Sequence, residues 1–433
     1  MKIYRYPSQA AEKKLSLIEN RSIGFRKKDV TAVARILDDV KKNGDDALLS
    51  YTRRFDSPKF KKAALKVSGK EMAEAGKQVD SAFVRALNRA ARQVGHFHRQ
   101  QRPSSWINAD RPGTLLGQIV RPVDAAGVYV PGGKEGKTPL VSTVLMCAIP
   151  AGIAGVKNIA MATPPMRNGK VNPHLLVAAK KAGVHDVYKI GSAWAVAALA
   201  YGTQTVPRAN VIVGPGNIYV TLAKKLVAGE VGIDMIAGPS EILIIADHTA
   251  KPAYIAADLL SQAEHDPLSS AVLVTTSQKV AAAVSTALDS QLATLSRRET
   301  ATASLKRYGA ILVVPDIATA IDFANRIAPE HLEVQTKDPL SHIGSIRNAG
   351  AVFLGEFTPE PVGDYVAGPN HVLPTAGTAR YASALSVDHF MKKSSLIQYS
   401  REAFRKEAKD IMCLAEVEGL GAHANAVRIR LGK

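Results

Sequence analysis

Two polar side chains near the end of a predicted helix have the spacing of paired metal ligands. Residues 256–267 read AADLLSQAEHDP, which places Gln262 and His265 three positions apart in a helical segment. Side chains with this spacing lie on one helix face, about one turn apart, so both could bind a single metal ion. The competing interpretation of these residues alone is an exposed helix end that is rich in polar groups.

A carboxylate and an imidazole stand side by side where the pattern changes from helix to strand. Residues 326–336 read RIAPEHLEVQT, with Glu330 directly before His331. Adjacent carboxylate and imidazole groups can serve as two bases with different pKa values. A solvated entry into a strand, without a catalytic part, explains the same two residues equally well.

Two further segments hold polar groups that a packed core does not require. Residues 355–375 are rich in glycine and proline and contain Asp364 and His371, which indicates a loop, where functional residues concentrate. Residues 414–430 place Glu418 and His423 on a predicted late helix. A lone histidine is more often a structural residue than a ligand, so both interpretations stay open for each histidine.

Two glycine turns follow predicted strands. The first ends the run GVYVPGG, and the second lies in VIVGPGNIYVTLAKKL, where Gly214 and Gly216 lead into a helix. A glycine turn at a helix N-terminus offers free backbone N–H groups and the positive end of the helix dipole to a phosphate. The spacing differs from the dinucleotide-binding fingerprint, because Tyr219 takes the place of the third glycine. A structural turn explains these residues as well as a cofactor loop does.

The elements that must position these groups change along the chain. The first part is predicted to be helical, because residues 30–40 carry apolar side chains at spacings of three and four. Farther on, short apolar runs alternate with helical segments. The predicted strands are GVYVP, NIAMATP, VYKIG, NVIVGP, ILIIAD, SAVLVTTS, AILVVPD, HLEVQT and AVFLGE. Such alternation implies an α/β fold with parallel sheets and helices on both faces, before a helical pattern returns from about Asp388.

Composition narrows the class of protein. The 433 residues are 46% hydrophobic and 22% charged, as in ordinary globular proteins, and two cysteines exclude a disulfide framework. The sequence has no run of the ~20 apolar residues that a membrane helix needs and no signal-peptide pattern, so we expect a cytoplasmic protein without a membrane partner. The net charge of +18 comes from scattered basic residues. Because no nucleic-acid motif accompanies them, we expect no nucleic-acid partner, whereas an anionic dinucleotide would suit the charge.

Taken together, these segments resemble the histidinol dehydrogenase family. The resemblance runs in order from about Arg121 to the C-terminal region, and the first ~110 residues are less diagnostic. The motifs that carry it are VYVPGG, AALAYGT, VGPGNIYV, VGIDMIAGPSE, ADLLSQAEHDP, PEHLEV, VGDYVAGPNHVLPT and EGLGAHA. One such motif would be a weak signal, but this series in sequence order is a specific one.

The resemblance implies a role for each candidate residue. One zinc ion per subunit would be bound by four residues with nitrogen or oxygen ligand atoms: Gln262, His265, Asp364 and His423. These four would also contact an amino-alcohol substrate, together with Ser240, His331, His371 and Glu418. Glu330 would be the base that activates water, and His331 the base that takes the proton of the alcohol. Tyr129 and Asn217 would contact NAD.

The implied activity is a four-electron oxidation of L-histidinol to L-histidine, through the aldehyde and with two NAD, in histidine biosynthesis. The alternative is a related zinc- and NAD-dependent dehydrogenase of another polar alcohol, such as a sulfonated diol. The pocket around Glu418, His371 and Arg380 would distinguish these two substrates. One departure from the family pattern is Trp194, which stands where the family commonly has a glutamine that contacts NAD. An indole cannot replace both hydrogen bonds of an amide.

The resemblance also implies two incomplete Rossmann-like domains with parallel sheets, as in the aldehyde dehydrogenase architecture, and small N- and C-terminal helical extensions. The expected division is an N-terminal arm at 1–25, a catalytic and zinc domain from 26–124 with 242–380, an NAD-binding domain at 125–241, and a C-terminal extension at 381–433. The terminal pieces would exchange in a homodimer. Glu418 and His423 would then complete the active site of the partner subunit.

Overall fold

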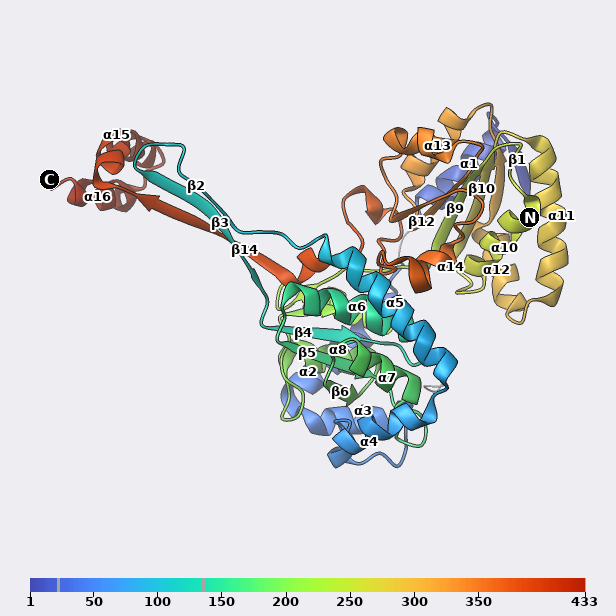
Figure 1. Cartoon of the computed structure of the whole chain (residues 1–433), viewed down its shortest axis with the longest axis horizontal. Coiled ribbons are helices and arrows are strands. Elements are labelled where there is room, and N and C mark those ends of the chain that lie inside the picture. Colours follow the sequence, from blue (N-terminus) through green and yellow to red (C-terminus); the bar gives the residue numbers. More distant parts are fainter. Residues whose placement is uncertain (22–23, 134–137, 433) are drawn as a thin grey trace. The chain divides into compact units, whose positions relative to one another are not determined.

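The computed structural model describes residues 1–21, 24–133 and 138–432. The chain divides into two compact units, one of residues 1–101 with 124–390 and the other of residues 102–123 with 391–433. The first unit contains two parallel sheets, and the second contains an antiparallel sheet. Figure 1 labels the elements along the chain.

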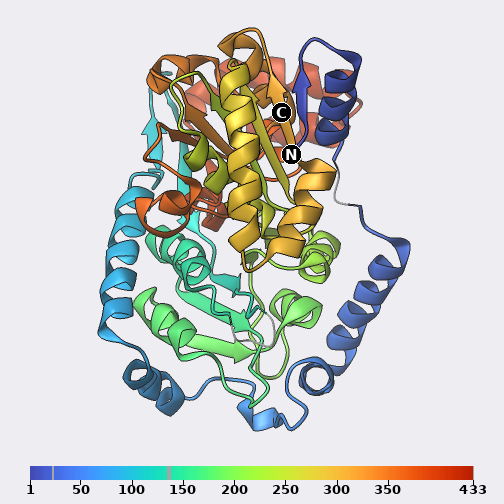
Figure 2. The ribbon, with the colours of Figure 1, turned by 90° about the vertical axis from the view of Figure 1, so that its right-hand side faces the viewer.

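A six-stranded parallel sheet forms one half of the first unit, in the order β1-β11-β10-β9-β12-β13. Its strands are β1 (Ile3–Arg5), β9 (Glu241–Ala246), β10 (Ser270–Thr275), β11 (Ala310–Val313), β12 (His331–Gln335) and β13 (Ala351–Leu354). Strands β9, β10 and β12 are buried at every position, as expected of strands with both faces covered. One face carries α1 (Gln9–Glu19) and α13 (Ile317–Ile327), and the other carries α10 (Pro252–Ala263), α11 (Gln278–Thr294) and α12 (Arg298–Tyr308), as Figure 2 shows.

A five-stranded parallel sheet forms the other half, in the order β6-β5-β4-β7-β8. Its strands are β4 (Ala125–Tyr129), β5 (Asn158–Thr163), β6 (Asp186–Lys189), β7 (Val211–Val213) and β8 (Gly232–Ile233). Two pairs of helices pack on it: α8 (Ser192–Tyr201) with α9 (Ile218–Val227), and α6 (Val141–Ala154) with α7 (Pro173–Lys181). The turn after β7 thus leads directly into α9, as the second glycine turn predicts.

The early helices pack against this five-stranded half. They are α2 (Lys27–Asn43), α3 (Asp45–Phe55), α4 (Gly69–Ala75) and α5 (Ser81–Arg99). The apolar face of α2, with Val33, Leu37 and Val40, is buried in one core with α8 and α9. Contacts of α5 and α4 with α6 and α7 extend the same half. This packing differs from the expected grouping of residues 26–124 with 242–380, because the apolar faces of these helices complement the helices of the five-stranded half.

The N-terminal segment adds to the six-stranded half of its own chain. Strand β1 pairs in parallel with β11, from Ile3 beside Ile311 to Arg5 beside Val313. Apolar residues of α1 are buried in the core that covers β9 to β12. The segment expected as a polar arm therefore contains a strand and a helix with a buried face.

The second unit has a long antiparallel pair at its centre. Strand β3 (Thr114–Pro122) pairs with β14 (Met391–Tyr399) along its whole length and with the short β2 (Trp106–Asn108). Helices α15 (Arg401–Val417) and α16 (Gly421–Arg430) follow, which confirms the expected helical C-terminal extension. Strand β14 was not expected, because its sequence MKKSSLIQY is polar and mostly exposed and lacks the apolar run of a buried strand.

The α/β fold class is confirmed, and the predicted strands all lie in the two parallel sheets. Strands β1, β2, β3, β8 and β14 are those that the apolar runs did not reveal. Within the described ranges, none of the helices combines the length and the apolar character that crossing a membrane requires.

Candidate active site

The predicted pair of bases lies at the start of a buried strand. Helix α13 ends at Ile327, and the next residue, Ala328, has φ of 51° and turns the chain back toward the sheet. Glu330 and His331 follow, and His331 is the first residue of β12. Both side chains are buried, at 7% and 3% exposure. The interpretation as a solvated strand entry is therefore wrong, and these two polar groups need partners inside the protein.

The neighbouring strand fixes how the two side chains are oriented. The carboxylate Oε2 of Glu330 accepts the backbone N–H of Glu241 at 2.9 Å. The Nδ1 atom of His331 lies 2.9 Å from the backbone oxygen of Glu241. Because a carbonyl oxygen only accepts, Nδ1 must carry the proton of a neutral ring, which leaves the lone pair on Nε2. This Nε2 atom is buried and has no hydrogen-bond partner among the described residues, so it is available as a base.

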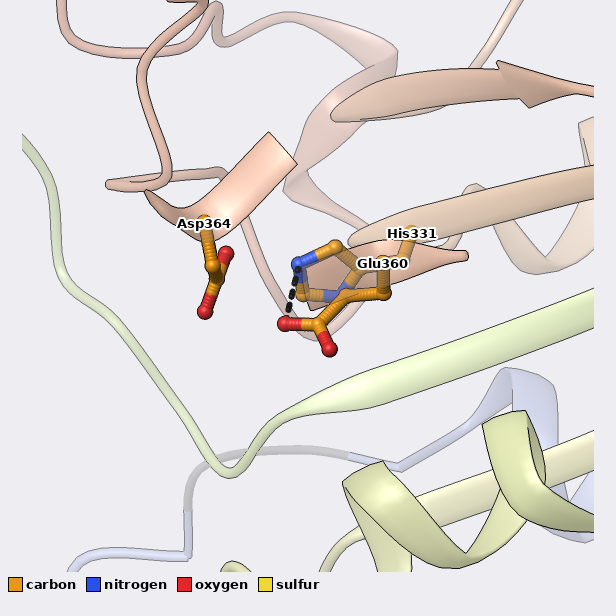
Figure 3. Close-up of side chains that lie close together, drawn as sticks. All are labelled: His331, Glu360 and Asp364. Carbon is orange, nitrogen blue, oxygen red and sulfur yellow. Dashed lines mark ion pairs between the residues drawn. The ribbon is translucent and has the colours of Figure 1, made fainter. Parts of the chain in front are cut away.

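A cluster of potential metal ligands surrounds that nitrogen. His331, Glu360 and Asp364 each offer an atom, and these atoms lie within 4.8 Å of one another. Figure 3 shows the three side chains facing one another, with the ion pair between His331 and Glu360 dashed. The Nε2 atom of His331 lies 4.0 Å from Oε1 of Glu360, and Nδ1 of His371 lies 3.8 Å from Oδ1 of Asp364. The glycine- and proline-rich loop thus supplies Asp364 to the cluster and places His371 beside it.

The charges of this cluster are poorly compensated by the protein. Burial raises the pKa of Glu330 well above its usual range, and burial lowers the pKa of His331. Burial, followed by the charge of Glu360, raises the pKa of Asp364 to about 9. Burial, followed by the charge of His331, lowers the pKa of His371 to about 4. A cation bound among these carboxylates would offset the free-energy cost of burying their negative charges so close together. The donor set therefore fits a divalent cation.

Gln262 gives independent support for a bound group. It lies in the last turn of α10 at 1% exposure, and neither its amide oxygen nor its amide nitrogen has a hydrogen-bond partner in the described chain. A buried amide without partners is rare in a native structure and indicates an unseen ligand such as an ion. His265 follows just after the helix and is exposed, with its backbone N–H donated to the carbonyl of Gln262.

One cavity is lined by residues from both halves of the first unit. It has a volume of ≈ 360 Å³, and its lining includes residues from both predicted sites: Gly216, Asn217, Ser240, His265, Glu330 and His371. A second cavity of ≈ 370 Å³ shares His371 and also contacts Asp364. Two of the candidate metal ligands, His265 and Asp364, the water-activating base Glu330 and the glycine turn therefore line one or the other of two cavities whose size suits small ligands.

A buried ion pair stabilises the glycine turn at Gly214, between β7 and α9. Lys224 of α9 pairs with Asp234, and both side chains are almost inaccessible. Lys224 donates to the carbonyl oxygen of Gly214 at 2.9 Å, and Oδ2 of Asp234 accepts the N–H of Gly214 at 2.7 Å. A side chain at Gly214 would collide with the backbone of Tyr129, since a Cβ atom would lie 2.1 Å from its oxygen. The turn is thus fixed on both sides, with the start of α9 open to the cavity.

The two predicted NAD contacts lie at this turn but already have structural partners. Tyr129 ends β4 at 4% exposure, and its hydroxyl accepts the N–H of Ser192 at 3.1 Å. Asn217 caps α9, and its Oδ1 accepts the N–H groups of Tyr219 and Val220 at 3.0 and 3.2 Å. Asn217 is exposed, and its cap uses only the amide oxygen, so the amide nitrogen faces solvent and can meet a ligand.

Trp194 fills its position by packing. Its ring stacks on Tyr51 and Phe55 of α3, with ring centroids 5.6 and 5.5 Å apart, and it is 4% exposed. The indole N–H has no partner among the described residues. The residue is therefore part of the core between α3 and α8.

The two remaining candidates belong to the second unit. Glu418 caps the end of α15, and His423 lies in the first turn of α16. Both side chains are exposed. The first unit alone therefore supplies Gln262, His265 and Asp364 of the predicted ligand set but does not supply His423.

Sequence reasoning missed three residues of this region: Glu360 and Glu241, which contact the bases, and Arg21, which contacts Glu241. Glu360 belongs to the TPEP stretch just before Asp364, and its distance of four from Asp364 was the available signal. Glu241 follows Ser240 in the quoted GPSE motif. Arg21 has no local signal, because only the tertiary fold brings it to Glu241.

Comparison with known proteins agrees with this geometry. The sequence profile of histidinol dehydrogenases matches residues 20–431. A histidinol dehydrogenase of Desulfotalea psychrophila is 56% identical over 401 residues, which cover 93% of this chain and 92% of that protein. One of Carboxydothermus hydrogenoformans is 51% identical over 399 residues, which cover 92% of this chain and 93% of that protein. The crystal structure of histidinol dehydrogenase from Elizabethkingia anophelis matches with a TM-score of 0.93 and 37% identity, covering 100% of this chain and 98% of that one. This chain therefore belongs to the histidinol dehydrogenase family of oxidoreductases.

Proposed function

We propose that this chain oxidises L-histidinol to L-histidine through the aldehyde, in two successive two-electron steps with NAD and with one zinc ion per subunit. The observation that carries the proposal is the pair Glu330–His331, whose unpartnered Nε2 faces the cluster with Glu360 and Asp364. When bound, zinc would hold and orient the substrate, and NAD would accept one hydride in each step.

The first step needs a base for the alcohol proton. His331 meets this need, because its Nδ1 proton is held by the carbonyl of Glu241 and its Nε2 lone pair is free. Burial keeps the ring neutral at physiological pH by lowering its pKa. Once Nε2 has taken the proton, the carboxylate of Glu360 at 4.0 Å stabilises the charged ring.

The second step needs water. An aldehyde has no second hydride to give until water adds to its carbonyl carbon. Glu330 would take a proton from that water, because its carboxylate lines the cavity beside Ser240 and His371. Its buried position raises its pKa, which makes the carboxylate a stronger base than an exposed one. The hydrate, which has already given one proton to Glu330, then loses its hydride and the proton of its remaining hydroxyl group to give the carboxylate of histidine.

The donor set for zinc in this proposal is Gln262, His265, Asp364 and the His423 of a second subunit. Gln262 supports it through its unpartnered buried amide, and Asp364 through its place in the acidic cluster. Nitrogen and oxygen ligands with open positions for substrate suit a zinc ion. Tyr129 and Asn217 would contact NAD, while Ser240, His371 and Glu418 would contact the substrate.

We further propose a homodimer in which the second unit completes the partner's site. Support comes from large apolar side chains that α15 and α16 leave exposed, including Leu414 at 66%, Val417 at 82% and Ile429 at 63%. Exposed apolar residues in such number on a small unit indicate an interaction surface. Glu418 and His423 on the same helices would then reach the site of the other subunit.

Stoichiometry of NADH tests the reaction. We expect two NADH for each histidinol consumed, activity that is lost on chelation, and recovery when zinc is added. One NADH per histidinol would reject the second step, and unchanged turnover after verified metal removal would reject the zinc. Turnover only with an anionic diol would favour the related dehydrogenase. Arg380, one of the residues expected to distinguish the two substrates, already donates to the carbonyls of Gly377 and Arg326.

Mixed dimers test the shared site. A Gln262→Ala subunit and a His423→Ala subunit each lack one zinc ligand, but their heterodimer retains one complete site. We expect each homodimer to be inactive and the mixture to recover part of the activity. Absence of recovery in heterodimers verified by mass would reject the exchange of the second unit.

A further inference from the structure

Arg21 is a buried arginine in the N-terminal segment, far in sequence from the bases. It is 8% exposed, and its guanidinium contacts the loop that holds Ser240. Nη2 donates to the carbonyl of Pro239 at 2.9 Å and to Oε1 of Glu241 at 2.5 Å, while Nη1 donates to the carbonyl of Leu268 at 3.2 Å. The arginine thus joins the loop before β9, the loop after α10 and a buried carboxylate.

Glu241 transmits these contacts to Glu330. Its side chain accepts from Arg21 and from the N–H of Ala376 through Oε1, and Oε2 faces the N–H of Glu330 at 3.3 Å. Its own N–H donates to the carboxylate of Glu330 at 2.9 Å. Glu241 and Glu330 therefore bind each other in both directions, side chain to backbone.

This reciprocal pair places two carboxylates in a buried region, and the guanidinium of Arg21 forms an ion pair with one of them, Glu241. The mutual repulsion of Glu241 and Glu330 would turn one carboxylate away if no cation were present. Because the guanidinium is a rigid fork, it holds the carboxylate of Glu241 in one orientation. The carboxylate of Glu330 then has one favourable position, on the N–H of Glu241 and facing the cavity.

We propose that Arg21 and Glu241 are positioning residues that hold the carboxylate of Glu330 where it can take a proton from water in the second oxidation step. The inference rests on the proposed function of Glu330. Through Arg21, the N-terminal segment would thus help to position a catalytic side chain. Arg21 and the side chain of Glu241 have less influence on the position of His331, because its Nδ1 contacts the backbone oxygen of Glu241 and not the side chain.

The substitutions Arg21→Met and Glu241→Gln test the proposal. Methionine removes the cation but keeps most of the apolar volume. Glutamine keeps the shape of Glu241 but presents an NH₂ group either to Arg21 or to the N–H of Glu330, and both are donors. We expect oxidation of supplied aldehyde to fall by about 100-fold or more, and oxidation of alcohol to aldehyde by less than about 10-fold, since a displacement of ~1 Å can cost about 100-fold.

Lys189→Met is the matched control. Lys189 is equally buried and pairs with Glu71 at 2.6 Å on the five-stranded half of the same unit. Its removal should lower thermal stability but leave the ratio of the two oxidation rates unchanged. Arg21→Lys serves as the conservative variant, since it keeps the charge but not the fork, and its ratio should lie between wild type and Arg21→Met.

The ratio of the two oxidation rates distinguishes a positioning role of Arg21 and Glu241 from a merely structural one. A change of the ratio in Arg21→Met and Glu241→Gln, absent in Lys189→Met, supports positioning. Equal losses in both oxidation steps, or the same ratio change in Lys189→Met, would overturn it. If Arg21→Met does not fold, an unchanged ratio in folded Arg21→Lys and Glu241→Gln overturns the proposal as well. Failure of the wild-type protein to oxidise the aldehyde would instead reject the proposed function itself.

Discussion

Replacement of Gly214 by alanine should damage both the fold and the binding of NAD. Gly214 lies directly after β7 with φ of 115°, a backbone region that L-residues rarely adopt. A Cβ atom there would lie 2.1 Å from the backbone oxygen of Tyr129, the last residue of β4. The N–H of Gly214 is also held by Asp234 at 2.7 Å, so the turn cannot easily rotate away.

The expected cost has two parts. The left-handed backbone disfavours alanine by ~1–2 kcal/mol. The collision requires β4 or the turn to move by about 1 Å, and such overpacking costs ~1–3 kcal/mol. The free energy of unfolding should therefore fall by about 2–5 kcal/mol. Because the shift displaces Tyr129 or the start of α9, the dissociation constant for NAD should rise by about 10-fold or more.

Gly183→Ala is the matched control for the backbone part. Gly183 has φ of 80°, and a Cβ atom there would meet no atom within 4 Å. We expect a loss of ~1–2 kcal/mol and no change in NAD affinity. Denaturant unfolding measures the stabilities, and calorimetric titration with NAD measures the affinity without depending on turnover.

The comparison of the two glycines decides whether the collision matters. Equal losses of stability in the two variants would show that the contact with Tyr129 adds nothing. An unchanged dissociation constant for NAD in Gly214→Ala would show that the turn does not position the cofactor. Either result would refute the steric reasoning.

Three further predictions concern single side chains. The carboxylate of Glu330 accepts the N–H of Glu241 at 2.9 Å, and the amide oxygen of Glu330→Gln can still do so, so the fold should persist. Quenched-flow assays should show aldehyde oxidation slowed by about 10²–10⁴-fold, because the general base is lost. Equal slowing of both oxidation steps would contradict this. Burial raises the pKa of Asp56 to about 7 from 3.8, so the folded state keeps a proton that the unfolded state releases, and stability falls as pH rises from about 4 to about 7. Asp56→Asn should therefore stabilise the protein more at pH 8 than at pH 5, with a difference of at most about 3 kcal/mol in denaturant unfolding, and equal gains at both pH values would refute it. In Trp106→Phe the buried Trp194 is the sole tryptophan, and its emission should be quenched when NADH binds at the cofactor turn; binding seen by calorimetry without quenching would place the cofactor elsewhere.

The sequence by itself determined the α/β class and the types of groups in the site. Apolar runs without alternation identified the strands of both parallel sheets, because strands covered on both faces need no polar positions. The adjacent pair Glu330–His331 and the loop with Asp364 and His371 were visible as polar residues at the ends of elements. Local patterns suffice there because neighbours in the chain are neighbours in space.

Only the tertiary structure decided what surrounds those groups. Glu360 and Glu241 approach His331 and Glu330 from other segments, and no spacing in the sequence relates them. The packing of α2 to α5 on the five-stranded half and the pairing of β14 with β3 likewise depend on complementary surfaces distant along the chain. The contact of Arg21 with Glu241 spans 220 positions, and a buried ion pair of that kind forms only when the whole fold excludes water from it.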